Sequence, residues 1–367
     1  MTVTILDGDC RAVLRTLPAG SVNCVVTSPP YWGLRDYGVA GQIGLETSPA
    51  MFVGEMVDVF REVRRVLRDD GTLWLNLGDS YATGAGKVGD HPGGGEQGSA
   101  WAGRPAPGRN AHAGRGVPRR ADGLAADRQN FGPMQQPNRM PIEGLKPKDL
   151  VGIPWRVAFA LQADGWYLRQ DIVWSKPNPM PESVTDRCTK AHEYLFLLSK
   201  SKRYYYDQDS ILEDVAPIER LSQATLADQF GSDRVPGKTN GPMKAVKRSG
   251  NKQRKDATGR GCPASGVDGS VPWEGSQRNK RSVWTVATQP FKEAHFATFP
   301  PALIEPCILA GSPEGGVVLD PFGGAGTTGL VADRLKRDAV LIELNPDFTA
   351  MARRRIKGDA PLFASVA

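Results

Sequence analysis

Hydrophobic positions in the first quarter of the chain alternate between short continuous runs and a longer stretch with helical spacing. Residues 22–27 form a short, β-branched run that is typical of a buried strand. Residues 50–68 place apolar side chains three and four positions apart and stop at an Asp-Asp-Gly sequence, which predicts an amphipathic helix that ends there. Residues 72–77 predict the next strand.

The same alternation continues further along the chain. A helix is predicted at 149–164, strands at 168–174 and 193–198, and then a strand at 316–320, a helix at 327–335 and a strand at 339–343. Strands separated by helices favour right-handed crossover connections. The pattern therefore predicts an α/β fold with a mostly parallel twisted sheet and helices on both faces.

Two segments rich in glycine and proline interrupt this pattern. Residues 84–148 hold 14 Gly and 8 Pro with little apolar periodicity, and residues 215–281 are of the same kind, so both predict loop-rich insertions. A chain of 367 residues, at roughly 150 residues per domain, suggests about two domains, although one large domain with insertions fits equally. We therefore expect one core built from residues 1–83, 149–214 and 282–367.

The formal net charge of +6 is concentrated in these insertions. Residues 84–148 have 10 basic against 5 acidic side chains and residues 215–281 have 13 against 6, which leaves the rest of the chain at −6. A run of like charge is often only a solvated surface. Two positive, glycine-rich loops on a mildly acidic core are more typical of proteins that bind a phosphate backbone, so we expect a nucleic acid partner.

Composition argues against several other classes of protein. Hydrophobic residues make up 40% of the chain, enough for a sizeable core, and no stretch approaches 18 apolar residues, so we expect no transmembrane helix. The first ten residues include acids and no apolar run, unlike a signal peptide. Five scattered cysteines without a C-x-x-C pair and four histidines without metal spacing predict free thiols, a reducing cytoplasmic compartment and no metal site.

A first candidate site lies between the strand at 316–320 and the helix that follows. Glycines at 324, 326 and 329 fit the pattern G-x-G-x-x-G, and Glu343 ends the next strand 23 residues after Asp320. A carboxylate in that place can accept hydrogen bonds from the ribose hydroxyls of an adenosine cofactor. An ordinary turn without a ligand contains similar glycines, and the pattern alone leaves both a dinucleotide and S-adenosyl-L-methionine open.

A second candidate site is the sequence Thr-Ser-Pro-Pro-Tyr-Trp at 27–32, directly after the first predicted strand. The two prolines stiffen the backbone and leave carbonyl oxygens free to accept hydrogen bonds beside an aromatic ring. Such a site suits a planar group with an exocyclic amine, such as cytosine or adenine. A Pro-Pro turn with a buried tyrosine is the simpler interpretation, but the carboxyl end of a strand is where open α/β sheets bind ligands.

Taken together, Ser-Pro-Pro-Tyr-Trp at 28–32 and Asp-Pro-Phe-Gly-Gly-Ala-Gly-Thr-Thr at 320–328 resemble motifs of the amino-methylating DNA methyltransferases, which modify cytosine N4 or adenine N6. The acceptor motif near the N-terminus and the cofactor motif near the C-terminus resemble the circularly permuted (β) class. The resemblance implies a single Rossmann-like, S-adenosyl-L-methionine-dependent domain that acts on double-stranded DNA at the nucleoid and reads its target with residues 215–281. It leaves open a homodimer and a cognate restriction endonuclease.

The resemblance also assigns roles to individual residues. Ser28 and the carbonyl of Pro29 would hold the target amine next to Pro30, while Tyr31, helped by Trp32, would stack on a base flipped from the duplex. The cofactor would contact Asp320, Phe322, Gly324, Gly326 and Thr327 with its methionine part, Glu343 with its ribose and Asp9 near its adenine, while Thr298, Phe299 and Pro300 would close the pocket. The reaction would be a direct in-line transfer without a covalent enzyme intermediate.

Three interpretations remain open at this point, and the amino-methylating DNA methyltransferase is the first of them. A nicotinamide-dependent oxidoreductase would explain the glycines but not residues 28–32, and a non-catalytic DNA-binding protein would explain only the charge. Carbon-5 methylation of cytosine needs a nucleophilic cysteine, but Cys307 after Pro306 lies in an apolar helical stretch and is expected in the core. Between the two amines, Ser28 favours cytosine N4 because serine precedes Pro-Pro-Tyr more often in the cytosine enzymes of the family, with adenine N6 as the alternative.

Overall fold

The computed structural model describes residues 1–34, 36–82, 142–214, 277–289, 298–359 and 365–366. Most of the two predicted insertions, at 84–148 and 215–281, therefore lies outside the described residues. The chain divides into a first unit, Met1–Ser210 with Arg281–Ala367, and a second unit, Ile211–Lys280. The described part of the second unit contains the antiparallel pair of strands β6 (Glu213–Asp214) and β7 (Gln277–Arg278).

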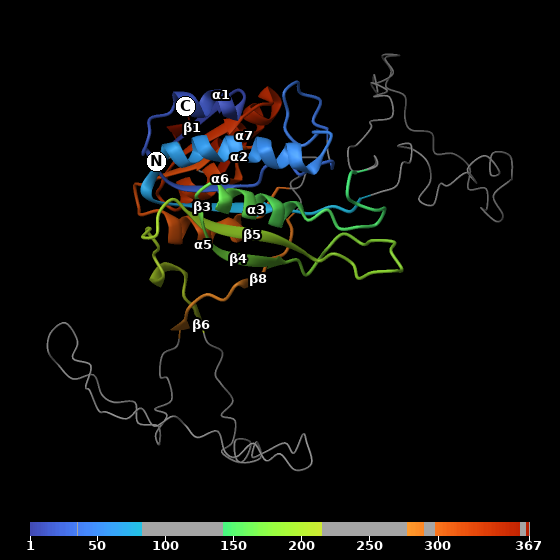
Figure 1. The fold of residues 1–367 in the computed structure, drawn as a ribbon. Coiled ribbons are helices and arrows are strands. Elements are labelled where there is room, and N and C mark those ends of the chain that lie inside the picture. The colour runs from blue at the N-terminus through green and yellow to red at the C-terminus, as the bar shows by residue number, and fades with distance from the viewer. Residues whose placement is uncertain (35, 83–141, 215–276, 290–297, 360–364, 367) are drawn as a thin grey trace, which may run out of the picture. The chain divides into compact units, whose positions relative to one another are not determined.

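The first unit is built on a nine-stranded sheet with the order β11-β1-β10-β9-β2-β3-β5-β4-β8 among the described residues (Figure 1). Its strands are β1 (Thr2–Asp7), β2 (Val22–Thr27), β3 (Leu67–Leu77), β4 (Tyr167–Ser175), β5 (His192–Ser199), β8 (Val283–Thr285), β9 (Val317–Asp320), β10 (Asp338–Glu343) and β11 (Ser365–Val366). In the described part of this sheet, only β5 runs antiparallel to its neighbours, β3 and β4. The prediction of a mostly parallel sheet is confirmed.

Two groups of helices cover opposite faces of the sheet (Figure 1). One group consists of α1 (Cys10–Thr16), α2 (Pro49–Val66) and α3 (Ile153–Ala163), and the other of α5 (Pro301–Gly311), α6 (Thr327–Arg334) and α7 (Pro346–Asp359). A short 3-10 helix, η3, spans Asp209–Ile211. Because β2 and β9 are neighbours in the sheet, segments near the two ends of the sequence build the centre of one fold.

Helix α2 illustrates how the sequence pattern produces an element. Ser48 caps its first turn by accepting a hydrogen bond from Met51 N at 3.2 Å, and Pro49 occupies the first helical position, where a missing N–H is tolerated. One face then buries the apolar residues Phe52, Met56, Val59, Phe60, Val63 and Val66 against the sheet. The repeating apolar spacing therefore predicts the helix correctly.

The end of this helix differs from the prediction. The helix stops at Val66, two residues before the predicted end, because Leu67 already pairs with Val22 in the sheet. The Asp-Asp-Gly sequence at 69–71 belongs to strand β3 and is not a helix stop. A Cβ atom on Gly71 would lie 2.5 Å from Leu67 Cγ, so the glycine serves close packing within the strand.

Three further observations concern the cysteine in α5, possible metal ligands and membrane-spanning helices. Cys307 lies inside α5 with no exposed surface, and its thiol donates to the Leu303 carbonyl at 3.6 Å, as expected for a core cysteine. Among the described residues, no group of His, Cys, Asp and Glu is arranged to hold a metal ion. No helix in the described part of the chain is long and apolar enough to cross a membrane.

Candidate active site

The two sequence motifs meet at the edge of the sheet where the parallel strands end. Thr27, the last residue of β2, donates a hydrogen bond from Oγ1 to Asp320 Oδ1 at 2.6 Å. Thr328, in the first turn of α6, donates to Asp320 Oδ2 at 2.6 Å, and Phe322 N donates to Oδ1 at 3.0 Å. Asp320, the last residue of β9, therefore connects the acceptor motif to the cofactor motif.

Burial sets the protonation of this carboxyl group. Asp320 is 1% exposed, and desolvation raises its pKa from 3.8 to about 6, although the hydrogen bonds from Thr27, Thr328 and Phe322 N oppose the rise. Because both oxygens already accept hydrogen bonds from the protein, Asp320 shapes the pocket and organises its walls. This is a structural contribution that the glycine-rich motif alone does not reveal.

The raised pKa of Asp320 leads to a prediction about stability. The folded state binds this proton more tightly than the unfolded state, so the contribution is fully present below about pH 4 and is lost as pH rises through about 6. Two pKa units correspond to about 3 kcal/mol. About half of this, roughly 1.4 kcal/mol, is lost between pH 5 and pH 7.5, so the melting temperature of the wild type should fall by about 2 °C relative to that of Asp320→Asn. Parallel melting curves by calorimetry would contradict this pKa.

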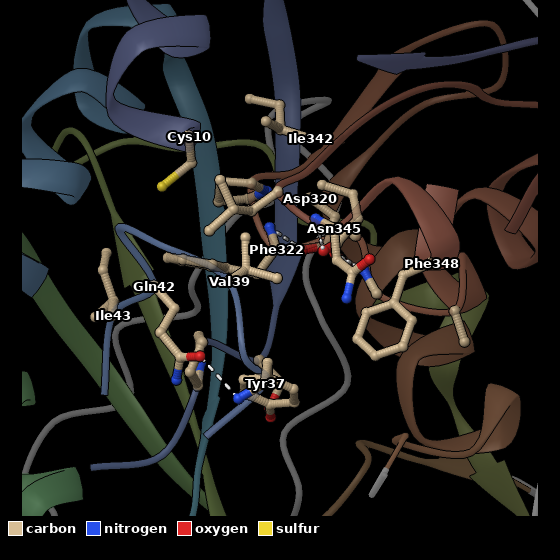
Figure 2. A pocket seen from close by; sticks show the side chains of 18 of the residues that line it. Cys10, Tyr37, Val39, Gln42, Ile43, Asp320, Phe322, Ile342, Asn345 and Phe348 are labelled. Atoms are coloured by element: carbon tan, nitrogen blue, oxygen red, sulfur yellow. Dashed lines mark hydrogen bonds between the residues drawn. The ribbon is translucent and has the colours of Figure 1, made fainter. Parts of the chain in front are cut away.

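A single pocket brings most of the predicted site residues together (Figure 2). Those that line it are Asp9, Ser28, Pro30, Thr298, Phe299, Asp320, Phe322, Gly324, Thr327 and Glu343. Its empty space, including the opening to solvent, is about 1110 Å³. The remaining predicted residues, Pro29, Tyr31, Trp32, Pro300 and Gly326, do not line it.

Glu343 joins the end of β10 to the glycine-rich turn. Its Oε2 accepts a hydrogen bond from Gly324 N at 2.7 Å, and its Oε1 accepts one from Asn345 N at 2.8 Å. Burial raises the pKa of Glu343, and the backbone donors oppose this. Each carboxylate oxygen has a further lone pair that can accept a hydrogen bond from a ligand. The carboxylate is therefore fixed in orientation and can still act as an acceptor.

Gly324 and Gly326, which both belong to the glycine-rich pattern, have different structural roles. Gly324 has φ of +50°, and a Cβ atom there would find only the Phe322 carbonyl at 3.8 Å, so the turn leaves space on the pocket side. Gly326 has φ of +75°, and a Cβ atom there would lie 2.8 Å from Ala352 Cβ in α7. Gly326 is therefore required for helix packing, and the expectation that it lines the cofactor pocket is corrected.

Asp9 combines a pocket position with a capping role. Its Oδ1 accepts a hydrogen bond from Arg11 N at 2.8 Å at the start of α1, and its carboxylate also pairs with the Arg11 guanidinium. These hydrogen bonds hold the pKa of Asp9 below its usual value. Arg11 also donates to the Gly41 carbonyl at 3.1 Å, so one ion pair ties α1 to a loop that borders the pocket.

Several lining residues come from segments that have no recognisable motif. Tyr37, Val39, Gln42 and Ile43 follow the acceptor motif. Asn345 directly precedes α7, and Phe348 lies in the first turn of that helix (Figure 2). The rings of Tyr37 and Phe348 pack edge to face with centroids 6.3 Å apart. Tyr37 N donates to Gln42 Oε1 at 2.7 Å, which shapes the loop. In the sequence, the four residues between 37 and 43 could have been recognised as site residues only by their position after the acceptor motif.

Beside the pocket, the acceptor motif is held by a hydrogen-bond network that includes residues of β3 and β5 and the residue directly after β4. Tyr31 Oη donates to Glu193 Oε2 at 2.7 Å, and Asn76 Nδ2 donates to Tyr31 Oη at 2.8 Å and to Ser28 Oγ at 3.3 Å. Glu193 also pairs with Lys176. Burial and the Glu193 charge raise the pKa of Tyr31 well above its ordinary value. We call Ser28, Tyr31, Asn76, Lys176 and Glu193 the acceptor network.

The structure corrects the prediction that Trp32 helps Tyr31 to stack on a flipped base. Trp32 is 1% exposed and donates from Nε1 to the Glu46 carbonyl at 2.8 Å, so its ring belongs to the core and is not available to stack on a base. The Tyr31 ring lies against Gly78, where a Cβ atom would come within 2.4 Å of Cε2. Pro29 is buried, and Pro300 precedes the first turn of α5.

The composition of the pocket wall favours one of the two cofactors that the glycine pattern left open. The described lining residues include the carboxyl groups of Asp9, Asp320 and Glu343 but no Lys, Arg or His. A dinucleotide would bring a pyrophosphate next to these carboxyl groups without a cationic side chain to meet it. S-adenosyl-L-methionine has no phosphate and carries a positive sulfonium, which fits an acidic wall with Phe322 and Phe348 beside it.

Comparison with known proteins agrees with this geometry. The sequence profile of a family described as DNA methylase matches residues 22–354. Type II methyltransferase M.Cfr9I of Citrobacter freundii is 43% identical over 356 residues, covering 97% of this chain and 88% of that protein. Type II methyltransferase M.SmaI of Serratia marcescens is 42% identical over 352 residues, covering 96% of this chain and 90% of that protein.

Solved structures show the same fold at low sequence identity. A Thermus thermophilus protein, assigned as a DNA modification methylase and solved with S-adenosyl-L-methionine, aligns over 100% of both chains with a TM-score of 0.52 and 20% identity. PvuII DNA methyltransferase (cytosine-N4-specific) aligns over 100% of this chain and 95% of its own, with a TM-score of 0.54 and 15% identity. The chain therefore belongs to the permuted class of the N4/N6 amino-methylating DNA methyltransferases, and its cofactor is S-adenosyl-L-methionine.

Proposed function

We propose that this DNA methyltransferase modifies N4 of cytosine, with N6 of adenine as the alternative. The observation that carries the proposal is the position of Ser28, which lines the cofactor pocket and also belongs to the acceptor network. A neutral hydroxyl at that junction can contact both the amine and the neighbouring ring nitrogen of a pyrimidine. Adenine presents N1 beside its amine in the same way, which is why it stays the alternative.

The hydrogen bonds of Ser28 leave the necessary atoms available. Asn76 Nδ2 occupies one lone pair of Ser28 Oγ at 3.3 Å, so one lone pair and the hydroxyl proton remain. The contact from Ser28 Oγ to Tyr31 Oη is 3.5 Å, too long to hold that proton strongly. We infer that Ser28 accepts from the target amine and donates to cytosine N3, while the Pro29 carbonyl accepts the second amine proton.

Catalysis then depends on positioning. Glu343 and the turn at Gly324 would hold S-adenosyl-L-methionine, whose sulfonium methyl group would be the electrophile. The N–CH₃ bond would form as the S–CH₃ bond breaks, with S-adenosylhomocysteine as the leaving group and one amine proton released to water. Ser28 and the Pro29 carbonyl orient the amine lone pair toward the pocket, and both acceptors bind a pyramidal nitrogen better than a planar one. Glu193 fixes the Tyr31 hydroxyl, so the ring keeps its orientation as a surface for the flipped base. No side chain forms a covalent bond to the base in this mechanism.

The base assignment has a direct test. DNA from a host without its own amino-methylation, expressing this chain, should contain N4-methylcytosine when its nucleosides are resolved by mass spectrometry. DNA from the same host carrying the empty vector provides the control. N6-methyladenine without N4-methylcytosine would contradict the base assignment and would leave the family, the cofactor and the pocket unchanged.

We further propose that residues 215–281 read the target sequence. The segment carries 13 basic against 6 acidic side chains and contains Trp273 and several Asn and Gln, which suit both phosphate and base-edge contacts. Because relatives are named Type II methyltransferases, we also propose a cognate restriction endonuclease as a partner in the cell.

A further inference from the structure

The connection between β4 and β5, residues 176–191, borders the acceptor network at the edge of the sheet where the parallel strands end. Lys176 N donates to the Ala191 carbonyl at 2.8 Å, which closes the base of this loop. The Lys176 ammonium pairs with Glu193, the residue that holds the Tyr31 hydroxyl. We call residues 176–191 the edge loop. Glu193 therefore links the base of the edge loop to Tyr31.

Both sides of the edge loop are anchored to the core of the first unit. On the incoming side, Asn178 Nδ2 donates to the Thr288 carbonyl at 3.2 Å and its Oδ1 accepts from Thr288 N at 2.9 Å. On the returning side, the Arg187 guanidinium lies 4.0 Å from the centroid of the Tyr81 ring. Arg187 also donates to Glu182 Oε2 at 2.6 Å.

A further anchor joins the loop to the end of β3. Lys190 Nζ donates to the Asp79 carbonyl at 3.0 Å, and burial lowers the pKa of Lys190. Lys148, on the neighbouring segment, pairs with Asp186 at 2.6 Å, and its side chain is 82% exposed. The loop is therefore held in place by contacts on both sides of residues 179–181, and Lys148, Arg187 and Lys190 are among the side chains that make these contacts.

Residues 179–181 of the loop, which we call its tip, lie between these anchors and include an exposed methionine. Met180 is 85% exposed, more than any other large hydrophobic side chain in the described part of the chain. Its neighbours Pro179 and Pro181, with Pro177 nearby, fix φ along the tip, so little backbone freedom is lost when the tip is enclosed. When a partner covers an apolar side chain that a stiff, anchored loop exposes to water, the free energy of the system falls.

We propose that the edge loop contacts the DNA and that Met180 inserts into the base stack when the target base leaves it. This inference rests on the proposed function. An exocyclic amine is engaged in base pairing inside a duplex, so the base must be extruded before Ser28 can hold it, and extrusion leaves a gap in the stack. Proteins fill such gaps with methionine, leucine, phenylalanine or proline, and Met180 belongs to the loop whose base borders the acceptor network.

The experiment compares two duplexes of about 30 base pairs that contain the methylated site, mapped by sequencing DNA from expressing cells. One duplex is fully paired, and the other has an abasic position opposite the target base, which removes the base pair that must be broken. On the paired duplex, Met180→Ala should lower kcat/KM about tenfold. On the abasic duplex, the loss should be less than twofold, because extrusion no longer needs assistance.

Two further variants complete the design. Met180→Leu keeps an apolar side chain of similar size and should behave like the wild type on both duplexes. Phe159→Ala removes another exposed apolar side chain, 55% exposed on helix α3, and should also leave both rates unchanged. An equal loss on the two duplexes, or no loss on the paired duplex, would overturn the proposal. The wild-type rate on the paired duplex tests the proposed function separately.

Discussion

Replacing Ser28 by alanine is expected to lower turnover by roughly 5- to 150-fold, the effect of losing about 1–3 kcal/mol of hydrogen bonding to the target amine. We expect the loss in the catalytic step because Ser28 belongs to the acceptor network, where Asn76 donates to its Oγ at 3.3 Å, and also lines the pocket. The dissociation constant of S-adenosyl-L-methionine should stay nearly the same, since Glu343 and Gly324 lie at the opposite motif.

Single-turnover methylation and calorimetric titration of the cofactor measure the two parts of this prediction. Ser21→Ala is a matched control, because that hydroxyl donates only to the Pro18 carbonyl at 2.7 Å, just before β2 begins. The control should retain wild-type turnover. A collapse of cofactor binding in Ser28→Ala would show that Ser28 supports the pocket and does not hold the amine.

Replacing Glu343 by glutamine should raise the dissociation constant of S-adenosyl-L-methionine by roughly 10- to 150-fold, as expected when about 1.5–3 kcal/mol of charged hydrogen bonding is lost. Both carboxylate oxygens accept backbone N–H groups, from Gly324 at 2.7 Å and Asn345 at 2.8 Å. An amide has only one oxygen, so its NH₂ group would face one of these donors. The turn would shift and the ribose would lose an acceptor.

Calorimetry with the cofactor, together with fluorescence anisotropy on labelled DNA, separates this effect from general damage, because DNA binding should remain. Asp347→Ala is the control carboxylate, since Asp347 begins helix α7 without lining the pocket. An unchanged cofactor constant in Glu343→Gln would show that Glu343 does not bind the ribose, and a larger loss in Asp347→Ala would assign that role to Asp347.

The parts of the fold that sequence predicts are those with strong local signals. Strands β2, β9 and β10 have continuous apolar runs, and they appear within a residue or two of their predicted ends. Strand β8 has three residues, and helix α7 buries only a narrow strip around Ala352 and Ile356, so neither has a clear pattern in the sequence. Their formation depends on packing against the rest of the sheet.

The same distinction between residues with and without a local sequence signal applies to the candidate site. Ser28, Asp320 and Glu343 were predictable because each belongs to a short motif next to a strand. Glu193 and Asn76 were not predicted, since they come from β5 and β3. Asn76 reaches Tyr31 because β3 pairs with β2, and Glu193 does so because β5 pairs with β3. Hydrogen bonds across 45 and 162 residues of sequence leave no local pattern.

The place of β1 in the sheet has a consequence for protein synthesis. Strand β1 pairs with β10 and β11. Val3 cannot pair with Ala339 until that residue, 336 positions later in the sequence, has been synthesised. At about 5–20 residues per second, a ribosome needs roughly 15–70 s to make that partner. During this time the nascent chain presents an unpaired strand containing Val3 and Ile5, a template for wrong pairing. Chaperone protection during translation therefore matters more for this chain than for one whose neighbouring strands are consecutive.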